Sequence, residues 1–150
     1  MNKKLEKSQK LLKFFSIIQL LSALAFALLL ILLLVAAKDD AIYETIKKNQ
    51  TEMFLSVAKL LINMALLFVS YYILNRTSKD PGQHNSALLI TLVVIAFEIF
   101  NFITSLGVGV PRNLVSMVVS VIVNIIIMLI IENVKLEYER LEREKRVGSL

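Results

Sequence analysis

Long apolar segments alternate with short polar segments along this chain. The apolar segments run from about residue 14 to 37, 53 to 74, 86 to 106 and 112 to 131. Each has the roughly 17 to 25 residues that an α-helix needs to cross the hydrocarbon of a bilayer. The pattern therefore predicts an all-α polytopic membrane protein, in which residues 14–131 form a bundle of four transmembrane helices.

The polar segments between the spans contain residues that are typical of loops and turns. Segment 38–52 predicts an exposed loop with a short helix that ends at Lys48. Segment 75–85 contains a Pro-Gly pair and predicts a turn-rich loop, and segment 107–113 predicts a tight connection. The fourth helix has no breaker after its apolar part. We expect it to continue through the charged residues 132–150.

The composition agrees with a membrane protein and excludes several kinds of active site. Of the 150 residues 57% are hydrophobic, and the mean hydropathy is +0.70, whereas soluble domains are about 45–50% apolar. The chain has no cysteine, which excludes disulfides, thiolate metal sites and cysteine nucleophiles. It has a single histidine, His84, and no recognisable catalytic motif. We therefore expect neither a metal or other cofactor nor an enzyme.

The basic residues predict how the chain is oriented. Residues 1–13 carry five lysines and one glutamate, and segment 75–85 and the tail also contain lysine and arginine. By the positive-inside rule both termini and segment 75–85 should face the cytoplasm, with residues 38–52 and 107–113 outside. Small size and a lysine-rich start look bacterial, which predicts the plasma (inner) membrane. Because the charges flank spans, the net charge of +5 does not indicate a nucleic-acid partner.

Each span carries a stripe of polar or small side chains on one helical face. At about 100° per residue, the members of a stripe fall within about 80° of one another. Lipid cannot hydrogen-bond these groups, so the stripes should face each other in a left-handed bundle. In chain order the stripes are Ser16, Gln19 and Ala23; Ser56, Lys59, Asn63 and Ser70; Thr91, Glu98, Asn101 and Ser105; and Asn113, Ser116, Ser120 and Asn124.

Several polar residues of these stripes lie at similar depths in the membrane, so we predict that they meet in one cluster. Gln19 lies nearer the inner face of the membrane and is expected outside this cluster. Lys59 should pair with Glu98, or else extend its stem to the outer headgroups. The preferred interpretation is structural, a set of hydrogen bonds that aligns the helices. The alternative is an ion or proton pathway in which Glu98 titrates. The expected members of the cluster are Lys59, Asn63, Glu98, Asn101, Ser120 and Asn124.

The helix after the fourth span carries an apolar strip of its own. Val134, Tyr138 and Leu141 continue from Ile127 and Ile131 with spacings of 4, 3, 4 and 3, which is a heptad seam about two repeats long. Glutamates and arginines one turn apart surround it. The strip is either one side of a solvated helix or a surface for docking and self-association.

Three functions agree with these features. The first is a non-enzymatic membrane subunit or interaction protein that lies in the lipid bilayer and assembles with itself or with a larger membrane protein. The second is a small oligomeric ion or proton channel or transporter with Glu98 as its titrating residue. The third is a membrane immunity protein that blocks a pore-forming toxin, for which size is the only argument.

Overall fold

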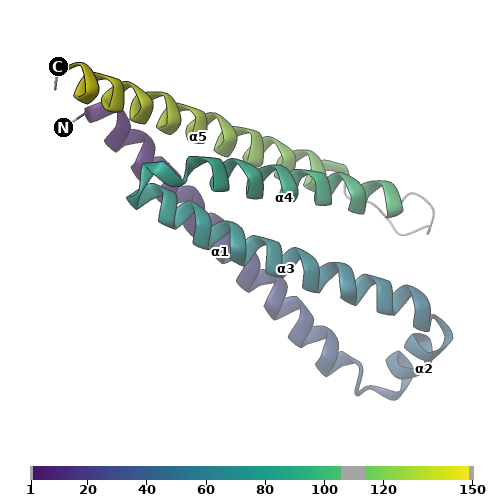
Figure 1. The fold of residues 1–150 in the computed structure, drawn as a ribbon. Coiled ribbons are helices and arrows are strands. Elements are labelled where there is room, and N and C mark those ends of the chain that lie inside the picture. Colours follow the sequence, from purple (N-terminus) through teal and green to yellow (C-terminus); the bar gives the residue numbers. More distant parts are fainter. Residues whose placement is uncertain (1, 106–113, 149–150) are drawn as a thin grey trace.

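The computed structural model describes residues 2–105 and 114–148, and these residues form helices joined by short connections (Figure 1). Four of the helices are long and apolar enough to cross a membrane. This confirms the predicted four-helix bundle, whereas the predicted connection at 107–113 lies outside the described residues. The elements are α1 (Lys3–Ala36), α2 (Asp40–Lys48), α3 (Gln50–Lys79), the 3-10 turn η1 (Pro81–Gln83), α4 (His84–Ser105) and α5 (Leu114–Gly148).

The first and last helices are much longer than a bilayer requires. With 34 and 35 residues, α1 and α5 are about 51 and 52 Å long at 1.5 Å per residue, against about 30 Å of hydrocarbon. The unbroken continuation of the fourth span is thus confirmed. The lysine-rich N-terminus also joins its span without a break, because Asn2 caps the helix and accepts a hydrogen bond from the Lys4 N–H at 3.0 Å.

The connection between the second and third spans is shorter than predicted. Helix α3 continues to Lys79, so only Asp80 and η1 separate it from α4. The Thr77 hydroxyl donates to the Ile73 carbonyl oxygen at 2.9 Å and lies 3.3 Å from the Gln83 carbonyl oxygen. The Asp80 carboxylate accepts from the Gly82 N–H at 3.1 Å. These bonds satisfy the helix end locally, and a longer loop is not needed.

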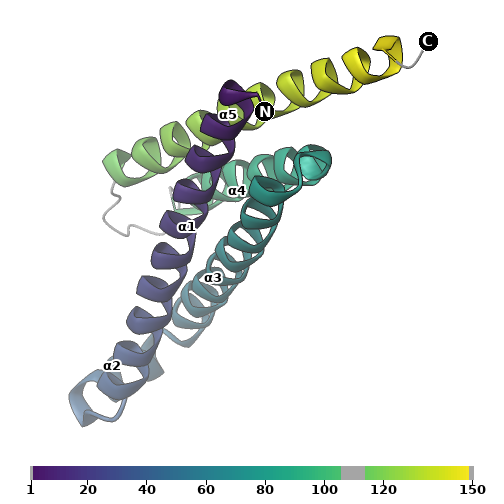
Figure 2. The ribbon, with the colours of Figure 1, turned by 90° about the vertical axis from the view of Figure 1, so that its left-hand side faces the viewer.

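The four long helices form two pairs that meet at one end and separate at the other. Helix α1 lies along α3, and α4 lies along α5 (Figures 1 and 2). We call the end with the chain termini the closed end, because the pairs pack together there. The opposite end, which carries α2, is the open end. The short helix α2 is capped by the Asp39 carboxylate, which accepts from the Ala41 N–H at 3.0 Å.

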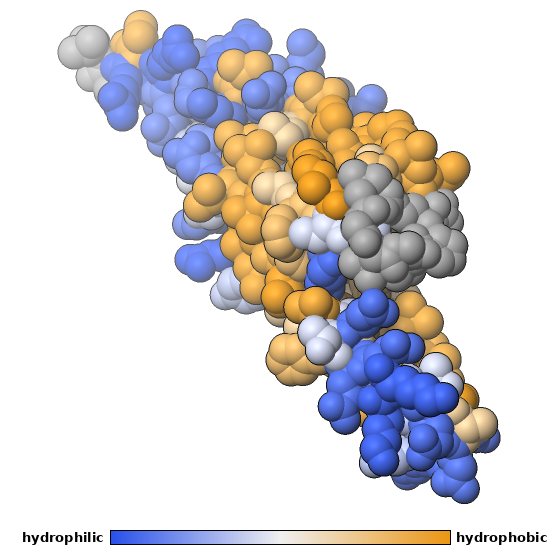
Figure 3. All heavy atoms as spheres, turned by 90° about the vertical axis from the view of Figure 1, so that its right-hand side faces the viewer, coloured by the Kyte–Doolittle hydropathy of each residue, from blue (hydrophilic) through white to orange (hydrophobic). Residues whose placement is uncertain are grey.

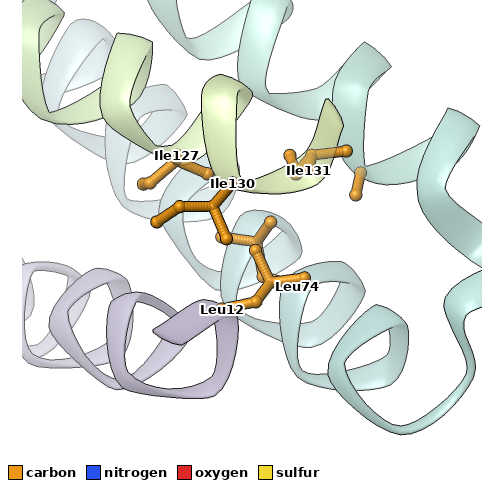
Figure 4. Packing of buried hydrophobic residues seen from close by; sticks show 6 residues of the cluster. Leu12, Leu74, Ile127, Ile130 and Ile131 are labelled. Atoms are coloured by element: carbon orange, nitrogen blue, oxygen red, sulfur yellow. The ribbon is translucent and has the colours of Figure 1, made fainter. Parts of the chain in front are cut away.

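The buried core lies entirely toward the closed end. Its side chains come from all four long helices and pack around the point where the pairs meet (Figure 4). Buried residues stop at Ala23 in α1, begin at Asn63 in α3, stop at Val94 in α4 and begin at Asn124 in α5. The central cluster consists of Leu12, Leu74, Ala87, Ile127, Ile130 and Ile131.

The buried positions of each helix follow the spacing of a left-handed bundle. In α3 the intervals between them are 4, 3, 4 and 3 residues, and in α1 they are 4, 3 and 4. The predicted stripe of α1 is buried in full. Toward the open end the prediction is wrong, because Ser56 and Ser116 are exposed there. The buried residues of these two helices are Leu12, Ser16, Gln19 and Ala23, and Asn63, Leu67, Ser70, Leu74 and Thr77.

The surface divides into zones of different polarity. Figure 3 shows a hydrophobic band between a hydrophilic region around α2 and a second one toward the closed end. Exposed leucine, isoleucine, valine and phenylalanine side chains make up this band. In water so large an apolar surface would be a liability, whereas lipid chains solvate it well.

Candidate functional site

A polar cavity lies at the point where the two helix pairs begin to separate. Its volume is about 380 Å³, and α1, α3, α4 and α5 all contribute to its lining. Four of the six side chains predicted to cluster line it together, and Gln19 joins them. The polar side chains that line it from all four helices include Gln19, Asn63, Glu98, Ser120 and Asn124.

Two buried amides connect α1 with α5 on one side of the cavity. The Asn124 Nδ2 group donates to the Ser120 carbonyl oxygen at 2.9 Å, and the Asn124 Oδ1 atom accepts from Gln19 Nε2 at 3.4 Å. The expectation that Gln19 lies outside the cluster is therefore wrong. Because α1 begins at Lys3, Gln19 is the seventeenth of its 34 residues and lies at the middle of the helix.

Glu98 and Asn63 occupy another side of the cavity. The Glu98 carboxyl group has the side chains of Ser120 and Asn63 as its hydrogen-bonding neighbours. Asn63 is only 8% exposed, and its Oδ1 atom has no hydrogen-bond partner in the structure. Glu98 is half-buried and is the single ionisable side chain among the described residues that line the cavity. An acid and a buried amide with an unpaired oxygen atom therefore belong to the lining of one cavity.

Lys59 does not take part in this arrangement. Its Nζ atom donates to Thr104 Oγ1 at 2.7 Å, near the last turn of α4. In residues 2–105 and 114–148 no salt bridge joins Lys59 to Glu98, and the ion pairs present there link side chains one turn apart on α1 or α5. The preferred pairing is not formed, because the lysine stem extends toward the open end, away from Glu98.

Lys59 instead lines a second, larger cavity between α3 and α4. This cavity has a volume of about 630 Å³ and lies at the open end, where the Phe97 and Phe100 rings stack with centroids 6.4 Å apart. Asn101, the other expected member of the cluster, lines neither cavity. Its Oδ1 atom is buried without a partner. The predicted cluster of six is thus four side chains in one cavity and two elsewhere.

The apolar strip of the C-terminal helix is largely covered by the chain itself. Val134 is fully buried, and Tyr138 and Leu141 are half-buried. The Tyr138 ring lies beside the η1 turn, with its centroid 6.2 Å from that of His84. Val134 therefore belongs neither to a solvated face nor to an open docking surface, because the turn between α3 and α4 and the start of α1 pack against this part of α5.

Polar contacts hold the ends of the chain together at the closed end. Asn2 Nδ2 donates to Glu137 Oε2 at 2.7 Å, which joins the start of α1 to α5. Farther along α5 the Tyr138 hydroxyl donates to the Glu142 carboxylate at 3.1 Å. This bond and the nearby negative charge stabilise the protonated phenol, and they raise the pKa of Tyr138 above its ordinary value.

The position of Gln19 on its helical face predicted its burial, although its estimated depth in the membrane excluded it from the cluster. Gln19 lies on the stripe with Ser16 and Ala23, both of which are fully buried beside it. Helical phase therefore correctly predicted which way the Gln19 side chain faces. Its depth in the membrane, estimated from the first apolar residue of the span, was wrong. The cavity also has apolar lining from Phe26 and Leu67, for which no sequence pattern gave a reason.

Comparison of this chain with protein-family models, with curated proteins and with solved structures finds no match. The class of protein therefore follows from the fold itself. Four helices that are long and apolar enough to span a bilayer define a multi-pass membrane protein. Within that class the chain is a four-helix bundle whose open end is unpacked and whose centre holds a half-buried acid.

Proposed function

We propose that the chain is a non-enzymatic membrane subunit whose open end is covered by helices of a neighbouring molecule. The observation that carries the proposal is the distribution of burial. In α1 and α3 no side chain is buried from residue 24 to 36 or from residue 50 to 62. Those two stretches make up much of both helices, and every side chain in them is exposed or only partly buried.

Membrane physics favours completion of such an open end. Helices associate in lipid through close packing and hydrogen bonds, since the hydrophobic effect does not drive them together. In α1, Leu24, Leu28, Ile31 and Val35 are all exposed and follow heptad spacing. A second copy of the chain is the neighbour that we expect, because isologous dimers are the commonest assemblies.

A single-cysteine experiment tests this proposal, since the chain contains no cysteine of its own. Leu28→Cys places a thiol on the open end of α1, and Leu89→Cys places one on α4 toward the closed end. The two leucines are similarly exposed, at 57% and 65%. We expect mild oxidation of membranes to give covalent dimers from the Leu28→Cys protein in at least about fivefold higher yield than from the control.

Equal yields from the two variants, together with a monomeric protein in nanodiscs, would contradict self-assembly at the open end. A larger complex that contains the chain once would instead assign the neighbour to another membrane protein. The test therefore separates a second copy from a different partner.

We further propose that the closed end faces the cytoplasm of the cell that makes the protein. Both termini and the η1 turn lie at this end, and the lysines of residues 3–13 lie there too. Basic residues beside spans are retained on the cytoplasmic side. In the same cysteine-free background, Lys3→Cys should react with an impermeant maleimide only after the membrane is opened.

A second candidate function rests on the cavity. Glu98 has no counter-charge among the described residues, and ionisable groups within spans mark ion and proton pathways by default. If the chain conducts, Glu98→Gln should abolish proton or cation flux in liposomes, and Glu132→Gln, which removes an exposed acid of α5, should leave it intact. Absence of flux from the wild-type protein would exclude this candidate.

A further inference from the structure

From the lining of the central cavity we infer that it binds an organic monocation, a primary ammonium group that carries an apolar chain. The inference concerns binding at Glu98 and does not depend on assembly at the open end. It rests on the charge of the cavity, on the unpaired acceptor of Asn63, on the apolar wall of the cavity and on its size.

The charge of the cavity calls for one positive charge on its ligand. Glu98 is the single ionisable side chain among the described lining residues, and Lys59 is bound to Thr104 at a different site. An ionised carboxylate within a bilayer is costly unless a cation neutralises it. A ligand with a single positive charge balances the carboxylate, whereas a dication would leave an excess charge of the opposite sign.

The free acceptors of the cavity match N–H donors. Asn63 is more than nine-tenths buried, and its Oδ1 atom is unpaired, although its side chain neighbours Glu98. An ammonium group has three donors, and a carboxylate together with an amide oxygen accepts two or more of them. Gln19 is 4% exposed and also belongs to the lining, although its Nε2 atom already donates to Asn124. A quaternary ammonium has no N–H and would leave Asn63 Oδ1 unpaired.

The size and the apolar wall of the cavity favour an organic ligand over a metal ion. Its volume of about 380 Å³ lies within the range of roughly 300 to 1,000 Å³ that is typical of small-molecule sites. Phe26 and Leu67 belong to its lining, and an aromatic face attracts a cation. The described part of the chain contains no group of three acidic, histidine or cysteine side chains that could hold a metal ion. An alkyl chain has a route of entry, because the helix pairs separate directly beyond the cavity.

Binding of decylamine to the full chain in nanodiscs tests the inference, with protein-free nanodiscs subtracted and equilibrium dialysis as the measurement. We expect saturable binding at one site. Glu98→Gln should weaken it about tenfold or more, since it removes a charged partner. The matched control Glu132→Gln should leave the affinity unchanged, because that acid is exposed on α5 and does not line the cavity. Decyltrimethylammonium and decanol should both bind more weakly than decylamine.

Asn63→Leu keeps the number and branching of the side-chain heavy atoms and removes the unpaired acceptor, so it should weaken decylamine binding while the helix content stays unchanged. This variant decides the matter if Glu98→Gln does not fold. Unsaturable binding by the wild type, equal affinity in Glu98→Gln, or equal affinity for decanol would overturn the inference. Displacement of decylamine by millimolar Na⁺ as efficiently as by octylamine would also overturn it, since the site would then be a metal-ion site.

Discussion

Replacement of Ile131 by alanine is expected to lower the free energy of unfolding by about 2 kcal/mol or more. Ile131 is 1% exposed and packs within the central cluster that joins the helix pairs. Truncation removes three carbon atoms and leaves a space that neighbouring helices fill only in part. Lipid solvates apolar groups well, so the loss here is one of packing contacts, which the bilayer does not restore.

The matched control is Leu136→Ala on the same helix. Leu136 is 62% exposed, and its truncation should change the stability by no more than about 0.5 kcal/mol. Both variants can be compared by titration with SDS in mixed micelles, with the near-ultraviolet circular dichroism of the tyrosines as the signal. Equal effects of the two substitutions would mean that the closed end is not the packed core of the protein.

Enlargement of Ala87 is the second change with a large expected effect. Ala87 is fully buried where α4 meets the other helices, in the cluster that contains Leu12 and Leu74. Small residues at such crossings allow the helices to approach closely. Ala87→Leu adds three carbon atoms to a site without free volume, and such overpacking costs about 1 to 3 kcal/mol. We expect α4 to be displaced from α1 and α3.

Ala96→Leu is the control for this substitution, because Ala96 lies on the exposed face of the same helix. It adds the same volume toward lipid and should leave the stability unchanged within about 0.5 kcal/mol. The cost can be measured by the same SDS titration as for Ile131→Ala, because both substitutions act on one cluster. Unchanged stability in Ala87→Leu would show that α4 is not held at this point.

The pattern of polar side chains in the sequence predicted most, but not all, of the polar residues at the cavity. Asn63, Glu98, Ser120 and Asn124 were predicted to meet because helical phase and approximate depth agreed, and the structure places all four at one cavity. Phase is reliable because a helix turns by a constant angle per residue. The depth of a residue in the membrane is predicted less reliably, because the helices differ in length and tilt. The tilt of a helix cannot be obtained from the length of its apolar segment. Gln19 was misplaced for that reason.

Lys59 shows a different limit. Two geometries were compatible with its position, a pair with Glu98 or an extended stem, and the sequence analysis preferred the pair. A four-carbon stem reaches partners more than one turn away, so the position of its backbone does not determine the position of its charge. In the structure the Lys59 ammonium donates to Thr104. This contact depends on how α3 and α4 pack against each other.

The amino-acid sequence by itself determined the four spans, the unbroken last helix and the faces that are buried at the closed end. It did so because a continuous apolar segment of about 20 residues satisfies its own backbone in lipid as a helix, and because polar side chains must turn away from lipid. Only the tertiary structure decided that the helix pairs separate beyond Ala23 and Asn63, and that Val134 of the C-terminal strip is buried by its own chain. Lipid solvates leucine as well as a protein core does, so Leu12 and Leu28 look alike in sequence, although packing buries one and leaves the other exposed.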